Sequence, residues 1–291
     1  MREVSHAEVT RLERKRLIDA LSKDHAVHPY GKWRGAFWRL VALVDLGVRR
    51  GHPGAVAAAE ETLDWVASPR RLATIRRRVI DGRLRRCASQ EGRALYCCVR
   101  VGVDDARLDL LAEALIESQW PDGGWNCDRR PRATHSSFHE SWGPLLGLAA
   151  YGATEAAARA ADFLLRHRVV FSDRTGEIAD RRFLALRYPA YWHYDLLVGL
   201  WALAESVGLD DVRVREALAL LESKRAGDGI WHVEGRWWKP PGSKGSNVDA
   251  VDWASAADRL LTERVWSVLA ARRVREDDGG RRHVPPIVAS S

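Results

Sequence analysis

Five side chains that could carry out acid–base or metal chemistry stand near the starts of two successive helical patterns. Cys127, His135 and His139 accompany the first start, and His193 and Asp195 stand at the second. Imidazole and carboxylate groups act as general acids and bases in enzymes. Thiolate, imidazole and carboxylate groups also bind zinc, and a catalytic zinc ion usually has three protein ligands and one water. If equivalent helix starts lie at one rim of the fold, these side chains converge there.

We predict two alternative uses for this group. The first is a catalytic set in which histidine transfers protons and a carboxylate orients it: His135, His139, His193 and Asp195. The second is a zinc site with the ligands Cys127, His135 and His193. A nucleophilic Cys127 beside a histidine is a further alternative. A structural alternative also exists, because Ser137 and Glu140 have the spacing of a helix capping box.

Tryptophan is unusually frequent, with 13 residues against six tyrosines and five phenylalanines. Its ring offers a large apolar area and one N–H donor, so it can line a cavity or fill a core. From the aromatic and cationic side chains on or beside the long loops we predict a substrate-binding set: Arg174, Tyr194, Trp231, Trp237 and Trp238. Arginine at such a position can clamp a carboxylate or a phosphate. The alternative for Trp237 and Trp238 is that their loop buries its own rings.

Apolar residues recur at helical spacing almost everywhere, and no convincing two-residue alternation interrupts them. This pattern predicts an all-α fold. We expect helices near residues 6–22, 36–48, 54–67, 70–80, 92–102, 105–119, 138–151, 154–168, 193–207, 211–224 and 257–272. The second helices of successive pairs end at positions that are 54, 47 and 56 residues apart: Trp65, Gln119, Arg166 and Glu222. A period of about 50 residues indicates a repeat fold built from helical hairpins.

The connections between these helices are of two kinds. Within a pair the connection is short and carries Gly followed by Asp or Thr, as in Gly152-Ala-Thr154. Gly ends one helix and the polar residue caps the next. Between pairs the connections are long: 120–137, 169–192 and 225–252. If the hairpins stack side by side, all long loops lie at one end, where functional residues usually collect.

The segment Gln119-Trp-Pro-Asp-Gly-Gly-Trp125 follows one of these pairs, and a weaker copy ends at Trp231. This Gln-Trp motif and the length of the hairpins resemble the α/α-toroid superfamily, which holds squalene-type terpenoid cyclases and the β-subunits of protein prenyltransferases. The resemblance covers roughly residues 30–272. It implies an α/α toroid of about five to six hairpins, and it implies that Gln119, Trp125 and Trp231 tie adjacent repeats together. The chain also looks like bacterial proteins labelled squalene-cyclase-like.

The chemistry of that superfamily carries over less well than its fold. Class II terpenoid cyclases protonate an alkene with the middle Asp of an Asp-x-Asp-Asp motif, and this chain contains no such motif. Protein prenyltransferases bind zinc through an Asp-x-Cys pair and a later histidine. The Asp-x-Cys pair is missing from residues 126–140, although Cys127 lies there, and His193 is a counterpart of the later histidine.

We therefore predict an enzyme with a pocket at one rim of the toroid. It acts on a small or isoprenoid-like substrate by acid–base or zinc-assisted chemistry. One alternative is a non-catalytic module that binds a ligand or a peptide. Another is a glycan-active enzyme, which needs two opposed carboxylates, and Asp195 with Asp249 or Asp252 are the candidates.

Charge and composition limit the possible partners and the compartment. Part of the net charge of +7 comes from eight arginines within residues 70–86, which a solvated helix explains without a nucleic acid. No apolar run suits a signal peptide or a membrane span, and the four cysteines lack C-x-x-C spacing. We expect a cytoplasmic protein with residues 1–273 as a single domain and 274–291 as a disordered tail. A protein partner and a homo-oligomer both remain open.

Overall fold

The computed structural model describes residues 6–277, and nearly all regular structure in this range is helical. The all-α prediction is therefore confirmed. The α-helices are α1 (His6–Leu21), α2 (Ala36–Asp45), α3 (Pro53–Val66), α4 (Pro69–Arg76), α5 (Ala88–Val101), α6 (Arg107–Glu117), α7 (Phe138–Tyr151), α8 (Thr154–Arg166), α9 (Leu196–Ala204), α10 (Arg215–Ser223) and α11 (Ala257–Asp277). Two short 3-10 helices precede α9 and α10, namely η1 (Arg181–Leu184) and η2 (Val212–Val214). Among the described residues, no helix is both long and apolar enough to cross a membrane.

The segment 70–80, which we expected to be one helix, is helical only as far as Arg76. The chain then forms an antiparallel hairpin of β1 (Val79–Ile80) and β2 (Arg83–Leu84). Asp81 and Gly82 between the strands have φ angles of 49° and 70°. An Asp-Gly pair favours this turn because both residues tolerate positive φ. The expected helix was wrong here because the turn chemistry outweighed the apolar spacing.

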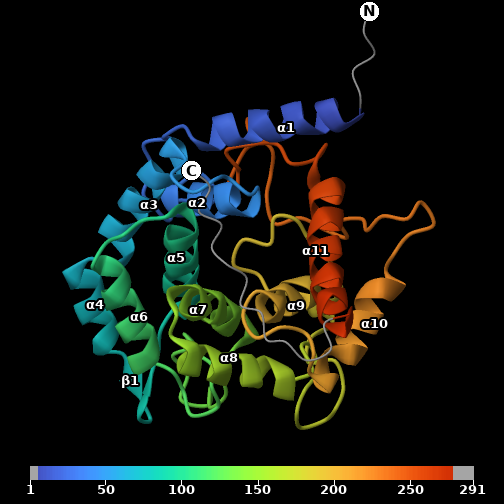
Figure 1. Ribbon diagram of the computed structural model, residues 1–291. Helices are drawn as coiled ribbons and strands as arrows, with labels where there is room; N and C mark the ends of the chain where they lie inside the picture. The colour runs from blue at the N-terminus through green and yellow to red at the C-terminus, as the bar shows by residue number, and fades with distance from the viewer. Residues whose placement is uncertain (1–5, 278–291) are drawn as a thin grey trace, which may run out of the picture.

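The helices differ in how much of their surface is buried. In α2, α5, α7 and α9 most positions around the helix are buried, whereas α3, α6, α8 and α10 bury one face. Figure 1 shows α3, α6, α8 and α10 on the outside of the molecule and α5, α7 and α9 nearer its centre. A helix that is apolar on all sides belongs in a core, and an amphipathic helix covers it.

Side chains of the Gln-Trp motif bond across the repeats. The Gln119 amide nitrogen donates to the Ala156 carbonyl at 2.9 Å, so the end of α6 is bound to α8 of the next pair. Trp125 Nε1 donates to the Leu115 carbonyl at 2.9 Å, and Trp231 Nε1 donates to the Leu221 carbonyl at 2.7 Å. In both cases the acceptor lies ten residues before the tryptophan. The two segments therefore share one local structure.

Helices α5 and α7 touch through their backbones. A Cβ atom added at Gly92 would overlap the backbone at Gly143 and Pro144, and one added at Gly147 would overlap the carbonyl of Gly92. At Gly143 an added Cβ would lie 3.0 Å from the Ser89 carbonyl oxygen. Small residues at a crossing let two helices approach this closely. The glycines therefore determine how near the side chains of α5 and α7 come to each other.

The two ends of the described chain meet through ion pairs between α1 and α11. Arg259 binds Glu13 at 2.6 Å, and Arg14 pairs with Glu263. Helix α11 continues to Asp277, beyond the expected end at residue 272. The rest of the predicted tail, residues 278–291, lies outside the described residues.

Because α5 and α7 are so close, we expect one added methyl group at their contact to destabilise the protein. We expect Gly92→Ala to lower the free energy of unfolding by about 1–3 kcal/mol, because the added Cβ has no space. Gly227→Ala is the matched control, since nothing lies within 4 Å of its added Cβ, and it should change stability by less than about 0.5 kcal/mol. Denaturant unfolding measures both, and equal midpoints for the two variants would contradict the crowding.

Candidate functional site

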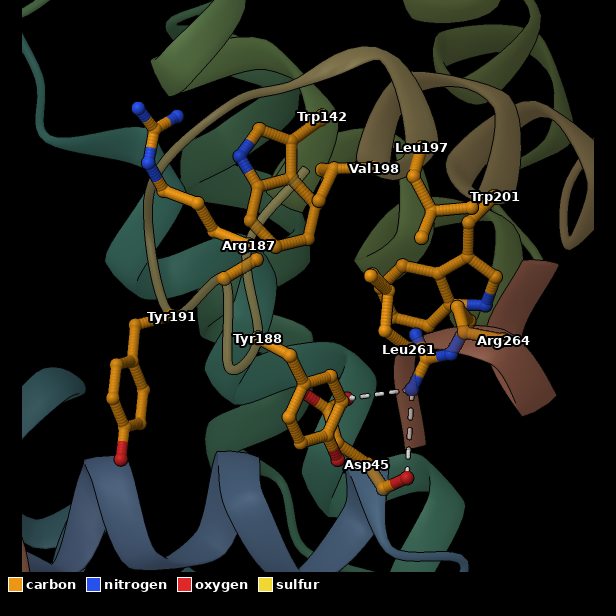
Figure 2. Close-up of a pocket in the computed structure, with 11 residues that line it drawn as sticks. Asp45, Trp142, Arg187, Tyr188, Tyr191, Leu197, Val198, Trp201, Leu261 and Arg264 are labelled. Atoms are coloured by element: carbon orange, nitrogen blue, oxygen red, sulfur yellow. Dashed lines mark hydrogen bonds and ion pairs between the residues drawn. The ribbon is translucent and has the colours of Figure 1, made fainter. Parts of the chain in front are cut away.

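A cavity lies between the inner helices and the loop that precedes α9. The space between its side chains is about 380 Å³, a value that includes open solvent at the mouth. The lining side chains come from α2, α7, α9, α11 and the loop: Asp45, Trp142, Arg187, Tyr188, Ala190, Tyr191, Leu197, Val198, Trp201, Leu261 and Arg264. Figure 2 shows Tyr188 and Trp201 beside Arg264, with Asp45 next to them. The wall is therefore mainly aromatic and aliphatic.

Positive charge exceeds negative charge around this cavity. Asp45 accepts a hydrogen bond from Arg93 Nη2 at 3.0 Å, and Arg264 Nη2 lies 3.6 Å from the same carboxylate oxygen. The Arg264 guanidinium also stacks over the Trp201 ring at 4.0 Å. Figure 2 shows the Arg187 guanidinium directed away from Arg264, toward the other side of the cavity. Asp45 thus faces two arginines, Arg93 and Arg264, and this excess of positive charge favours an anion.

Arg93 is the most unusual residue near this cavity. Its side chain is 1% exposed, and its Nε and Nη1 have no hydrogen-bond partner among the described residues. Its Cζ lies 5.0 Å from the Trp142 ring and 5.2 Å from the Trp201 ring, both of which line the cavity. Buried donors without an acceptor are costly, and such a group in a native structure calls for a partner. Arg93 does not line the cavity itself but lies behind these rings, where two of its donors have no acceptor among the described residues.

Two of the predicted histidines lie together beside the loop that precedes α9. The His193 ring stacks on Trp237 with centroids 3.6 Å apart and on Trp192 at 4.1 Å, and His139 lies 5.4 Å from the Trp192 ring. Burial lowers the pKa of His139 to about 4 and that of His193 to about 3. Both imidazoles are therefore neutral at pH 7. The Arg187 guanidinium lies 4.5 Å from the Trp237 ring, so it links this group, the histidine–tryptophan cluster, to the cavity.

One donor of the histidine–tryptophan cluster has no acceptor. Trp192 Nε1 is buried without a hydrogen-bond partner among the described residues. The Lys32 ammonium lies 5.3 Å from the same ring. A ligand oxygen near Trp192 would find both a hydrogen-bond donor and a cation there.

The other predicted catalytic residues have different surroundings. Asp195 is buried at the N-cap of α9, where its Oδ1 accepts a bond from the Val198 N–H at 2.9 Å. Burial raises the pKa of Asp195 to about 7. His135 is exposed in the loop after α6, and its carbonyl accepts a bond from Asn126. The structure thus places His139 beside His193 but leaves His135 at the surface.

The predicted substrate-binding residues are spread over several environments. Arg174 is exposed in the loop after α8, and Tyr194 is buried with its hydroxyl bound to the Val169 carbonyl. Trp231 is buried against Trp266, and Trp238 Nε1 donates to the carbonyl of Tyr188. Of the five, Trp237 contacts a predicted catalytic side chain, His193, and Trp238 is bound to a cavity-lining residue.

The carboxylates considered for glycan chemistry lie in unlike places. Asp249 is buried and accepts hydrogen bonds from the Tyr191 hydroxyl and from Trp253 Nε1 at 3.1 Å. Burial raises the pKa of Asp249 to about 6. Asp252 is exposed and accepts a bond from the Ala254 N–H. Tyr191 lines the cavity, so Asp249 supports its wall.

Cys127 lies with a different set of ligands from the predicted one. Within residues 6–277, the group of three possible metal-binding atoms within 4.8 Å of one another comprises Cys87, Cys127 and Glu140. His135 and His193 are outside this group. The Cys127 thiol is hydrogen-bonded to the Cys87 thiol. This hydrogen bond lowers the pKa of Cys87 and raises that of Cys127. Burial raises the pKa of Glu140. We call these three residues the thiol–carboxylate cluster.

The capping box expected at Ser137 and Glu140 does not form. Ser137 is the N-cap of α7, but its side chain makes no capping bond. Glu140 Oε2 instead accepts bonds from the N–H and the hydroxyl of Ser89, both at 2.9 Å. The N–H groups of the first turn of α5 lack partners within their own helix. The close α5–α7 contact brings one of them to Glu140, which therefore caps the neighbouring helix.

Comparison with protein-family models, with curated proteins and with solved structures found no match to this chain. The case for function therefore rests on the geometry of the sites.

Sequence reasoning missed the charged residues of the cavity, namely Asp45, Arg93 and Arg264. A signal for Arg93 exists in the sequence. Its helix continues with Ala94-Leu-Tyr-Cys-Cys98, and apolar side chains on all sides leave no solvated face for the arginine. An arginine in such a helix must be buried and paired.

The raised pKa of Asp195 predicts a pH effect on stability. An unfolded Asp has its ordinary pKa of 3.8 and the folded residue one of about 7, so the folded state holds its proton more tightly. Stability from this group is present below pH 4 and is lost as the pH rises toward 7, by at most about 1.4 kcal/mol per pH unit. Asp195→Asn keeps the N-cap acceptor and removes the titration, so its stability relative to wild type should rise across this range.

Denaturant midpoints of wild type and Asp195→Asn, measured from pH 4 to pH 8, test this expectation. Asp252→Asn is the control, because that exposed carboxylate also accepts a backbone N–H. A difference between wild type and Asp195→Asn that does not change with pH would show that Asp195 titrates normally.

Proposed function

We propose that the helical pairs close into an α/α toroid and that the protein is an enzyme for a small anionic molecule with an apolar body. The inner and outer helices, the repeated tryptophan bonds and the contact of α1 with α11 support the toroid (Figure 1). The resemblance of the Gln-Trp segment to terpenoid cyclases and prenyltransferases agrees with this arrangement. The substrate occupies the cavity between α7, α9 and α11.

The observation that carries this proposal is a pair of arginines: Arg264 lines the cavity, and Arg93 lies behind the aromatic wall with two nitrogens that have no partner among the described residues. Arg93 is already paired with Asp45, and Arg264 contacts the same carboxylate, so one positive charge remains between the two arginines. A carboxylate or phosphate of the substrate supplies the missing acceptor and the missing charge. Aromatic rings around the arginines then receive the apolar part of the molecule. The aromatic and aliphatic wall favours an apolar body, such as a small isoprenoid or an aromatic ring.

The catalytic groups of this proposal are His139 and His193. Both imidazoles are neutral at pH 7, so each has a ring nitrogen that can accept a hydrogen bond or a proton from substrate. Because burial lowers their pKa values, a proton taken up from substrate is held weakly and is readily passed on. Arg187 lies between the cavity and the Trp237 ring on which His193 stacks, and Trp192 adds a free N–H donor. A substrate whose anionic group is held by Arg93 and Arg264 can extend from the cavity toward this histidine–tryptophan cluster.

Binding is tested by titrating the protein with a short prenyl diphosphate and measuring the quenching of tryptophan fluorescence. We expect Arg264→Gln to raise Kd at least about tenfold, because it removes a charged hydrogen-bond donor from the cavity. Arg225→Gln is the matched control, since Arg225 also stacks on a tryptophan, Trp231, but does not line the cavity. An equal Kd for both variants and wild type, or no quenching by any anionic probe, would remove the proposed site.

Catalysis is tested by incubating the protein with a panel of short prenyl phosphates and aromatic carboxylates and measuring conversion by mass spectrometry. We expect the double variant His139→Gln and His193→Gln to reduce conversion at least about a hundredfold, because both bases are lost. His135→Gln is the control, since His135 is exposed in the loop after α6. If the double variant still converts the substrate, His139 and His193 are not the catalytic bases. A probe that binds without any conversion favours the non-catalytic binding module instead.

A further inference from the structure

The thiol–carboxylate cluster brings together three parts of the chain that are far apart in sequence. Cys87 is the N-cap of α5, Cys127 follows the Gly-Gly-Trp segment, and Glu140 stands in the first turn of α7. The two sulfur atoms and a carboxylate oxygen lie within 4.8 Å of one another. A divalent ion placed among them can reach all three with small side-chain adjustments.

Backbone hydrogen bonds determine the position of both thiols. The Arg86 N–H donates to the Asn126 carbonyl at 3.0 Å, and these residues directly precede Cys87 and Cys127. On the other side, the Trp125 N–H donates to the Ser141 hydroxyl of α7 at 3.1 Å. The loop that carries Cys127 is therefore bound both to the start of α5 and to α7. The pair of thiols is built into the scaffold and does not depend on a free loop.

The carboxylate is positioned just as firmly. The crossing of α5 and α7 at Gly92 and Gly143 brings Glu140 against Ser89, whose N–H and hydroxyl both bond to Oε2. Hydrogen bonds from the surrounding protein orient metal-binding carboxylates in this way. The Cys127 thiol is within hydrogen-bond reach of the same carboxylate.

The cluster lacks a cation from the protein. Glu91 takes the nearby guanidinium groups, since Arg86 binds it at 2.7 Å and Arg71 at 2.9 Å. Among residues 6–277, no arginine or lysine forms an ion pair with Glu140. A buried carboxylate is normally paired with a cation or bound to a metal. Glu140 is therefore buried without an ion pair of its own among the described residues, and the nearby Arg71 is already paired with Glu91.

We propose that Cys87, Cys127 and Glu140 bind one zinc ion and leave its fourth position open to solvent. Two thiolates and a carboxylate form a ligand set that zinc accepts, and thiolates select it over calcium and magnesium. Both thiols are half-exposed, so an ion and a water can reach them.

This zinc site is separate from the cavity proposed for substrate. Ser89, which orients Glu140, and Arg93, which packs against the cavity-lining ring of Trp142, are four residues apart on α5. The two sites therefore occupy neighbouring turns of one helix but share no ligand. The zinc proposal can therefore be tested independently of the substrate proposed for the cavity.

The first test is the metal content of protein produced with added zinc and purified without chelators or a histidine tag. We expect about one zinc ion per chain, bound by the three residues. Cys87→Ser, Cys127→Ser and Glu140→Gln should each reduce this content to below about one tenth. Cys97→Ala is the matched control, because Cys97 is a buried thiol on α5 outside the cluster. The proposal would be overturned if wild-type protein were folded but contained no zinc, or if the three ligand variants bound as much zinc as wild type.

A second test uses wild-type protein only and so does not depend on the folding of variants. Cobalt added to the metal-free protein should produce sulfur-to-cobalt charge-transfer absorption and the strong visible bands of a tetrahedral site, and zinc should abolish them. Zinc should also protect Cys87 and Cys127 from alkylation, identified by peptide mass spectrometry, and a chelator should restore the reaction. Unprotected thiols, or a Cys87–Cys127 disulfide in protein that takes up no metal, would exclude the site.

Discussion

The backbone contact between α5 and α7 is the constraint on which both candidate sites depend. Gly92 and Gly147 have no Cβ, and any larger side chain would overlap the facing helix. This contact brings Glu140 of α7 to Ser89 of α5. About one turn further along α5, it brings Arg93 over the Trp142 ring of α7. A wider crossing would separate Glu140 from the thiols and would leave Arg93 without its aromatic neighbours.

Buried charge is the second organising feature, and it follows from the first. Burying an arginine costs free energy unless a carboxylate and hydrogen-bond acceptors surround it. Asp45 supplies one acceptor to Arg93, while two nitrogens of the guanidinium keep none among the described residues. A core built only for stability would contain an apolar side chain at this position. In the proposed function, an anionic ligand would complete the surroundings of this arginine.

Local sequence signals predicted most of the secondary structure. The apolar spacing gave α7 at its observed bounds, Phe138–Tyr151. Other ends were less accurate, since α5 begins at Ala88 and not at residue 92, and α9 spans Leu196–Ala204 where 193–207 was expected. Gly102 and Gly152 end α5 and α7 with φ angles of 85° and 96°, as the short Gly-containing connections indicated. The expected helix at 70–80 failed after Arg76, because the Asp81-Gly82 turn is a local signal of a different kind.

The sequence by itself determined the helical class, the repeat and the segments in which reactive side chains occur, because helical spacing, capping and glycine effects act over a few residues. Only the tertiary structure decided which of those side chains meet. Cys127 was recognised, but its neighbours are Cys87 and Glu140 and not His135 and His193. Contacts between residues distant in the chain depend on how closely helices pack, and no local pattern around Cys127 encodes the crossing of α5 with α7.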